Sequence, residues 1–302
     1  MKLFAPILVG IATLAAQVSA NGVCYDPNHA ASGTMDAASI AADMKVIKSH
    51  GFNTVRTYIS LLGSKESGTN IGLTIASTNL NITAALGVPY PQSDYVAQMD
   101  AALTAANTGG VAYIFVGNEN LAGANNVPSE MIQVIKSIKA LVPSTVKVGT
   151  VQRNTEVINY SGISGWSDLV AACDVVGVNV HPYFTPGTTA ASAIDVVKDQ
   201  WAVMQKNVGD KLMVTETGWP SKGTLSGSTG SVAGMQKFYS DYKTWSSSMD
   251  EAFYFQIFDT PYKTNAYEKS YGLLTSDSQE KFSLADASAT ETAGTVSPKR
   301  LR

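Results

Sequence analysis

Short apolar runs recur along the chain and are separated by longer amphipathic stretches. There are eight: GVCY at residue 22, TVRTY at 54, LNITAAL at 80, AYIFVGNE at 112, VKVGTVQ at 146, DVVGVNVHPYF at 174, LMVTET at 212 and AFYFQIF at 252. Most are apolar throughout rather than at alternate positions, which is typical of strands covered on both faces. Successive runs start 26 to 40 residues apart, which leaves room for a helical crossover. The pattern predicts an α/β fold, a (β/α)8 TIM barrel in a single domain.

The intervals between the runs carry helix signals. Asp36 is placed to cap a helix whose apolar stripe is Ile40, Met44 and Ile47, and Gly51 is placed to end it. Three more stripes at helical spacing are predicted to face the sheet: Met131, Ile135, Ile138 and Leu141 after Pro128; Ile194, Val197, Trp201 and Met204; and Met235, Tyr239, Tyr242 and Trp245.

The two ends of the chain differ from the rest. Lys2 is followed by an apolar run to Leu14 and then by the small-residue pattern Val18-Ser19-Ala20, so we predict a signal peptide at residues 1–20 and a secreted protein. Residues 283–302 are rich in Ala, Ser and Thr with little periodicity, and they are predicted to form a flexible tail. The catalytic barrel domain is then expected at residues 21–282.

Composition excludes several classes of function. The 302-residue chain has a net charge of -3 and a pI of about 5.6, which argues against a nucleic-acid partner and favours an uncharged polymer or small molecule. No stretch after the first 20 residues is long and apolar enough to cross a membrane. Cys24 and Cys173 fall in separate parts of the predicted barrel, so we expect two buried free thiols. The three histidines show no metal-site spacing, and no metal or cofactor is expected.

Two of the apolar runs end in a glutamate. Glu119 closes YIFVGNE after the fourth run, and Glu216 lies at the end of the seventh. In a parallel barrel every strand delivers its C-terminal residues to one rim, so the fold should bring these carboxyls into one cleft although 97 residues separate them. A carboxylate pair at one cleft is what a retaining glycosidase requires. Arg56, predicted inside a strand, needs a carboxylate partner, and we place it near Glu216.

The motifs around these glutamates resemble glycoside hydrolase family 17. They occur in order along nearly the whole mature chain: GVCY at 22–25, VRTY at 55–58, VGNE at 116–119, GVNVHPYF at 177–184, TETGWPS at 215–221 and KSYGLL at 269–274. The resemblance implies a (β/α)8 barrel without a cofactor that acts on β-1,3-glucan or laminari-oligosaccharides, either as an endo-β-1,3-glucanase or as a β-1,3-glucanosyltransferase. The mature chain is shorter than the plant enzymes it resembles, which suggests short cleft loops and a fungal-type enzyme. We expect it to be secreted, extracellular or in the cell wall, and monomeric.

The resemblance also implies roles for individual residues. Glu119 would be the general acid/base, Glu216 the nucleophile, and Asn118 a partner of the sugar 2-hydroxyl at the cleavage point. The remaining substrate-binding residues that it implies are Tyr25, Tyr58, Tyr183 and Trp219 along the cleft, with Lys263 and Glu268 at the rim near the acid.

Several alternatives stay open from the residues alone. A non-catalytic glucan-binding barrel would keep the aromatic residues, and another β-linked polymer such as mannan or cellulose would use the same strand-end glutamates. The absence of a G-x-S-x-G elbow, a dinucleotide motif and a P-loop argues against other enzyme classes. His181 could bond a sugar hydroxyl or fix its loop. Asn81 and Asn159 are glycosylation sequons, of which Asn81 is predicted to lie inside a strand.

Overall fold

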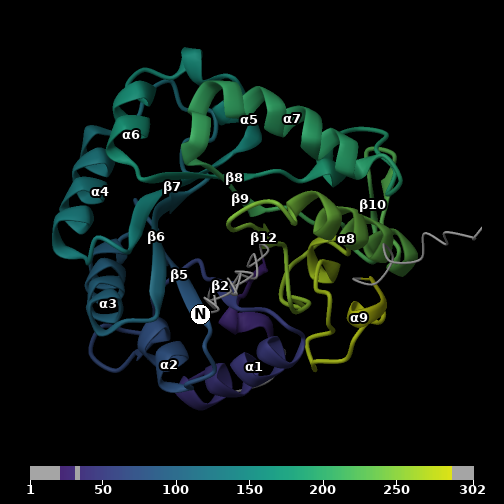
Figure 1. Cartoon of the computed structure of the whole chain (residues 1–302), viewed down its shortest axis with the longest axis horizontal. Coiled ribbons are helices and arrows are strands. Elements are labelled where there is room, and N and C mark those ends of the chain that lie inside the picture. Colours follow the sequence, from purple (N-terminus) through teal and green to yellow (C-terminus); the bar gives the residue numbers. More distant parts are fainter. Residues whose placement is uncertain (1–20, 31–34, 288–302) are drawn as a thin grey trace, which may run out of the picture.

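The fold is a ring of eight parallel strands with helices outside it. The computed structural model describes residues 21–30 and 35–287. The sheet runs in the order β12-β1-β2-β5-β6-β7-β8-β9. A parallel bridge between Thr217 and Tyr254 brings β9 and β12 together and nearly closes the barrel. Figure 1 looks along the barrel and shows the helices as an outer ring. The predicted (β/α)8 TIM barrel is confirmed.

All eight apolar runs form the barrel strands. Their bounds are β1 (Gly22–Cys24), β2 (Thr54–Arg56), β5 (Thr83–Val88), β6 (Val111–Asn118), β7 (Lys147–Arg153), β8 (Val175–Asn179), β9 (Leu212–Glu216) and β12 (Phe253–Tyr254). Two small antiparallel hairpins lie outside the barrel sheet: β3 (Leu61–Leu62) with β4 (Thr69–Asn70), and β10 (Thr224–Leu225) with β11 (Ser228–Thr229). Each hairpin lengthens a loop that follows the carboxyl end of a barrel strand.

The helices are α1 (Ala37–Ser49), α2 (Ile71–Ser77), α3 (Tyr95–Thr108), α4 (Ser129–Leu141), α5 (Asn154–Ile158), α6 (Trp166–Ala172), α7 (Ala193–Val208), α8 (Val232–Ser246) and α9 (Leu284–Ala287). Asp36 caps α1 as predicted, because its side chain accepts the backbone N–H of Ser39 in a capping box. Ile40, Met44 and Ile47 of that helix are fully buried.

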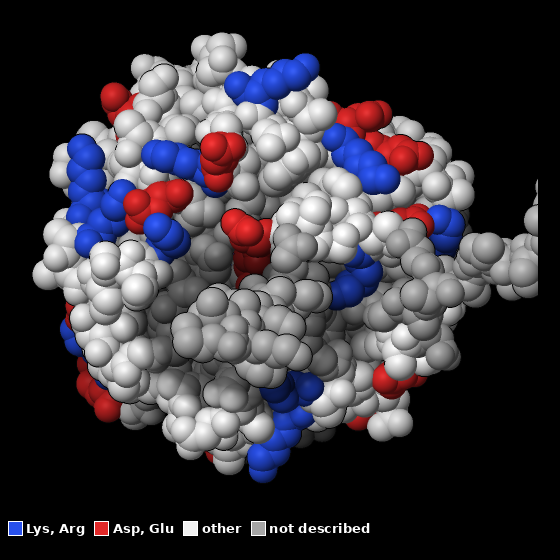
Figure 2. All heavy atoms as spheres, viewed as in Figure 1, with Lys and Arg blue, Asp and Glu red and all other residues white. Residues whose placement is uncertain are grey.

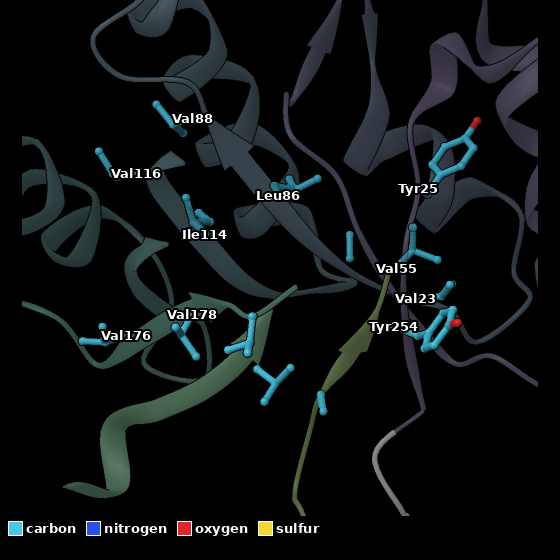
Figure 3. Close-up of a cluster of buried hydrophobic side chains, with 14 of the residues drawn as sticks. Val23, Tyr25, Val55, Leu86, Val88, Ile114, Val116, Val176, Val178 and Tyr254 are labelled. Atoms are coloured by element: carbon cyan, nitrogen blue, oxygen red, sulfur yellow. The ribbon is translucent and has the colours of Figure 1, made fainter. Parts of the chain in front are cut away.

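The strands bury both faces, and alternate residues enter two different cores. Val23, Val55 and Ile114 face the helices in the larger core, part of which Figure 3 shows along neighbouring strands. Cys24, Phe115 and their counterparts on the other strands fill the inside of the barrel. Burial on both faces explains why the runs are apolar throughout. Cys24 and Cys173 are both buried and free, as predicted.

Three expectations about local structure were wrong. Asn81 is exposed in the loop before β5 rather than inside a strand, and it and Asn79 adopt positive φ angles of 53° and 56°, which strands do not have. Leu141 is 57% exposed because α4 ends there. The folded part reaches beyond residue 282, since Leu284 is buried against the core. The predicted signal peptide lies outside the described residues, and so does the predicted tail from 288 onward.

The close approach of β7 to β8 predicts one severe substitution. Gly149→Ala would place its Cβ 1.7 Å from the carbonyl oxygen of Val175, so the strands would have to separate. We expect the free energy of unfolding to fall by about 2–3 kcal/mol, measured by urea unfolding. Gly162→Ala is the matched control, because an added Cβ there meets nothing within 4 Å. Equal stability of the two variants would contradict the prediction.

Candidate active site

Glu119 and Glu216 line the same cleft at the carboxyl ends of the strands. The cleft has a volume of about 630 Å³. Its walls are Glu119, Arg153, Asn154, Thr155, Asn179, His181, Phe184, Thr185, Pro186, Gln200, Glu216, Phe255, Thr260, Lys263, Glu268 and Tyr271. Figure 2 views the same end as Figure 1 and shows acidic atoms near the middle of this face, among mostly uncharged ones. The barrel therefore brings the two predicted carboxyls together.

The end of β6 is bent so that Glu119 reaches the cleft. The pairing of β6 with β7 shifts register between Phe115 and Asn118. Gly117 has a φ of 75° and Glu119 a φ of 55°. A left-handed conformation costs a non-glycine residue roughly 1–2 kcal/mol. The backbone N–H of Glu119 donates to the carbonyl of Val151 at 2.9 Å, which helps to hold this conformation.

Glu216 is the last residue of β9 and is held by two basic side chains. Its Oε1 accepts from Nη1 of Arg56 at 2.6 Å, and its Oε2 lies 3.1 Å from Nε2 of His181. The guanidinium of Arg56, which is 1% exposed, also donates from Nη2 to Oδ1 of Asn118 at 2.7 Å. The predicted pairing of Arg56 with Glu216 is confirmed.

Asn179 connects the two carboxyl neighbourhoods. Its Nδ2 donates to Oε1 of Glu119 at 2.7 Å and to Oδ1 of Asn118 at 3.2 Å. Its Oδ1 accepts from Oγ1 of Thr215, the residue before Glu216, at 2.9 Å. This bond from the strand of Glu216 fixes the side-chain amide so that its N–H groups face Glu119.

The two carboxyls differ in protonation. Burial and then the nearby charge of Glu216 raise the pKa of Glu119, although the hydrogen bond from Asn179 opposes the shift. Burial would also raise the pKa of Glu216, but the charge of Arg56 and the hydrogen bond from His181 outweigh it and hold the pKa below its ordinary value. Glu119 thus tends to keep its proton while Glu216 is ionised.

The other predicted site residues fall into three groups. Lys263 and Glu268 line the same cleft as Glu119, in the segment that follows β12, and their role beside the acid stays a prediction. Asn118 and Tyr58 line a separate cavity of about 10 Å³ beside Arg56. The guanidinium of Arg56 lies 4.8 Å from the centre of the Tyr58 ring.

Three predicted aromatic contacts are not available to a ligand. Tyr25, Tyr183 and Trp219 have no exposed surface. The hydroxyl of Tyr25 donates to Oδ2 of Asp43 at 2.6 Å, and Tyr183 packs edge-to-face on Trp219 with ring centres 5.0 Å apart. These rings support the cleft wall from behind. Among the described aromatic rings of that wall, Phe184 is the most accessible, at 48%, and Phe255 is partly exposed.

The sequence did not lead us to predict four residues that line the cleft: Asn179, Arg153, Asn154 and Gln200. Asn179 and Arg153 each end a barrel strand, so the rule that identified Glu119 and Glu216 also applies to them. Gln200 lies on α7, and no sequence signal distinguishes it from the exposed polar residues of that helix.

Comparisons with known proteins agree with this geometry. A family model described as the BtgE/BtgC glycoside hydrolase domain matches residues 22–272. The chain is 31% identical over 210 residues to the probable beta-glucosidase btgE of Aspergillus terreus, covering 68% of this chain and 36% of that protein. It is 27% identical over 271 residues to the probable family 17 glucosidase SCW10 of Saccharomyces cerevisiae, covering 85% of this chain and 65% of that one. The chain thus spans about a third of the length of the first relative.

A solved structure is similar over most of the barrel. It is an active-site mutant of the Rhizomucor miehei beta-1,3-glucanosyltransferase in complex with laminaritriose, with a TM-score of 0.71 and 25% identity. The match covers 86% of this chain and 95% of that chain.

The opposite pKa shifts predict opposite stability effects of two amide variants. Glu119→Gln should increase the free energy of unfolding at pH 7. The stability that Glu119 contributes at low pH is lost as the pH rises through its raised folded-state pKa, and a glutamine avoids that loss. Glu216→Gln should instead lower the free energy of unfolding by about 3–5 kcal/mol, because Arg56 is left buried without a carboxylate.

Urea unfolding followed by tryptophan fluorescence measures both effects. The advantage of Glu119→Gln should shrink as the pH falls through the raised pKa of Glu119 and should be absent below the ordinary pKa of glutamate, about 4.3. If both variants lose the same stability at pH 7, the assigned difference between the two carboxyls is wrong.

Proposed function

The chain belongs to the BtgE/BtgC glycoside hydrolase family, which confirms its resemblance to glycoside hydrolase family 17, and we propose that it is a retaining glycosidase acting on β-1,3-glucan. Glu119 is the general acid/base and Glu216 the nucleophile. The observation that carries this proposal is the pair of carboxyls in one cleft, one with its pKa raised and the other with its pKa lowered.

The first step uses both protonation states. Protonated Glu119 donates its proton to the glycosidic oxygen, and the bond from that oxygen to the anomeric carbon breaks. Ionised Glu216 attacks the same carbon and forms a glycosyl ester. Because Asn179 donates to Oε1 of Glu119, that oxygen is already engaged as an acceptor, which favours Oε2 as the oxygen that carries the proton.

Formation of the ester changes the acid into a base. The negative charge of Glu216 is among the causes that raise the pKa of Glu119, and the ester removes this charge. The pKa of Glu119 then falls, and its carboxylate accepts a proton from the incoming hydroxyl. Water as the incoming group gives hydrolysis, and a sugar hydroxyl gives transfer.

The substrate proposal is β-1,3-glucan or laminari-oligosaccharides. It is supported by the Rhizomucor miehei glucanosyltransferase, whose structure contains laminaritriose, and by the motifs shared with family 17. The cleft also presents neutral polar groups beside an exposed Phe184 ring, a combination suited to sugar hydroxyls and sugar faces. We propose both endo-β-1,3-glucanase and glucanosyltransferase activity on fungal cell-wall-type glucan.

We also propose that the protein is secreted to the cell wall, on the basis of the signal-peptide pattern at residues 1–20. In the part of the chain that the structure describes, no helix has the length and apolar character needed to cross a membrane.

Azide rescue tests the two assigned roles. Glu216→Ala should lose turnover, and azide should restore it by entering the vacated face to give an α-glycosyl azide. Glu119→Ala should retain activity only on donors with good leaving groups, with azide giving the β-product. NMR of the products distinguishes the anomers. A β-azide from Glu216→Ala would show that the roles are reversed, and a wild-type protein that binds laminari-oligosaccharides without changing their length would be a glucan-binding barrel.

The pH profile of kcat/KM tests the role of Asn179. We expect a bell-shaped profile. Its acid limb reflects protonation of Glu216, and its alkaline limb reflects loss of the Glu119 proton. The hydrogen bond from Asn179 lowers the pKa of Glu119, so Asn179→Ala should move the alkaline limb to higher pH. Asn118→Ala removes a neighbour of Asn179 that has no bond to Glu119, and its alkaline limb should stay in place. Equal shifts in both variants would contradict the assignment.

A further inference from the structure

The amino ends of β1 and β12 lie side by side at the end of the barrel opposite the cleft. Gly22 pairs with Phe253 in the parallel register of the two strands, and the backbone N–H of Gly22 donates to the carbonyl of Ala252 at 3.1 Å. This pairing places Asn21, the residue before β1, next to Glu251, which precedes Ala252. Because the carboxyl ends of the strands form the cleft, this pair lies far from the catalytic carboxyls.

Asn21 is held in place by three separate segments of the chain. Its backbone carbonyl accepts from the N–H of Asn53 at 3.3 Å. Its Oδ1 accepts from Nζ of Lys243 on α8 at 2.9 Å, and its Nδ2 donates to the carbonyl of Gly51. These contacts fix the position of the Asn21 backbone nitrogen at the amino end of the barrel.

Glu251 is a partly buried carboxylate that accepts hydrogen bonds from backbone nitrogens. Its Oε1 accepts from the N–H of Ala252 at 3.1 Å. The other donors to its carboxyl are the N–H groups of Asn21 and Gly22 and the side chain of Thr54. Burial raises the pKa of Glu251, and these hydrogen bonds oppose the shift without cancelling it. The carboxyl is thus surrounded by donors, and one of them is the nitrogen of Asn21.

This carboxylate lacks a paired cation. Among residues 21–30 and 35–287, no lysine, arginine or histidine forms an ion pair with Glu251. The charge of Glu251 acts on the pKa of Lys243, but the ammonium of Lys243 is bonded to Asn21 instead. A positive charge on one of the donor nitrogens would supply the missing partner.

We propose that cleavage after Ala20 turns the backbone nitrogen of Asn21 into an α-ammonium group that forms an ion pair with Glu251, so that removal of residues 1–20 completes the barrel at its amino end. The inference rests on the predicted signal peptide and is independent of the proposed glycosidase activity. It makes Glu251 a binding site for the chain's own new amino terminus.

The covalent step is hydrolysis of one peptide bond by a signal peptidase. The oxygen of water forms a bond to the carbonyl carbon of Ala20 as the bond to the Asn21 nitrogen breaks. Ala20 leaves as a carboxylate, and both protons of the water end on the nitrogen of Asn21 as –NH3+. An amide N–H offers one uncharged donor, whereas the ammonium offers three donors and a full charge. Since hydrogen bonds between charged groups are roughly twice as strong as neutral ones, the cleaved chain is the more stable one.

A double-mutant cycle on the full chain tests this ion pair. The chain is secreted from yeast with its own residues 1–20, with and without a Gly-Ser insertion between Ala20 and Asn21, and N-terminal sequencing identifies the first residue of each mature protein. The insertion moves the ammonium away from Glu251 and leaves an uncharged amide at Asn21. It should lower the melting temperature by roughly 3–6 °C in the otherwise wild-type chain, and by about 1 °C or less in the Glu251→Gln background.

Asp250→Asn is the matched control, because it removes one negative charge from the exposed neighbour of Glu251. The insertion should lower the melting temperature of this variant as much as that of the wild type.

A second measurement needs no change at Glu251. An ion pair keeps the α-amine protonated, and only the neutral amine reacts with an acylating reagent. At neutral pH the α-amine of the mature wild type should be acylated about tenfold more slowly than that of the insertion variant, as followed by mass spectrometry.

The outcomes separate this inference from the proposed function. A mature protein that begins at Asn21, with an insertion effect that depends on Glu251, would support it. A first residue other than Asn21, equal insertion effects in the wild-type and Glu251→Gln chains, or equal acylation rates would overturn it. The azide experiment tests the catalytic proposal separately.

Discussion

The structure of the site depends on one buried ion pair, Arg56 with Glu216. Both side chains are almost inaccessible to solvent, so each requires the other to remain charged inside the barrel. The guanidinium also bonds Asn118 and the backbone carbonyl of Thr215, and so it ties β2 to β6 and β9. The same contact that satisfies a buried charge therefore places the nucleophile and keeps it ionised.

Glu119 has the opposite character because, among the described residues, no basic side chain forms an ion pair with it, and the charges of His181 and Arg153 lower its pKa less than burial and Glu216 raise it. Its carboxyl is close enough to Glu216 for that charge to raise its pKa, while Arg56 is already committed to Glu216 and Asn118. The left-handed backbone at Glu119 is a further cost that ideal packing would avoid. Strain of this kind persists where surrounding contacts fix it and is common at functional sites. Here the left-handed backbone directs the end of β6 toward the mouth of the barrel, where Glu119 lines the cleft.

The sequence was sufficient to predict the barrel and the carboxyl pair. Both follow from the spacing of the apolar runs and from the position of polar residues at their carboxyl ends. A buried strand has a visible apolar run, and a polar residue at its carboxyl end must reach the rim. The sequence carries no such signal for whether an aromatic ring is buried or lines the cleft. Tyr183 and Trp219 lie in loops after strands, yet their rings turn inward and pack on each other. The contact between Gln200 and Asn154 could not be predicted for another reason, since it depends on how α5 and α7 lie against each other in space.

In the proposed mechanism one pair of carboxyls can serve two outcomes. Cleavage needs only that the donor sugar reach Glu216 and that its glycosidic oxygen reach Glu119. Transfer needs in addition that a sugar hydroxyl compete with water, which is always in large excess. In the proposed mechanism the balance between hydrolysis and transfer therefore depends on which hydroxyl, that of water or that of a sugar, reaches the glycosyl ester, and not on the carboxyls alone.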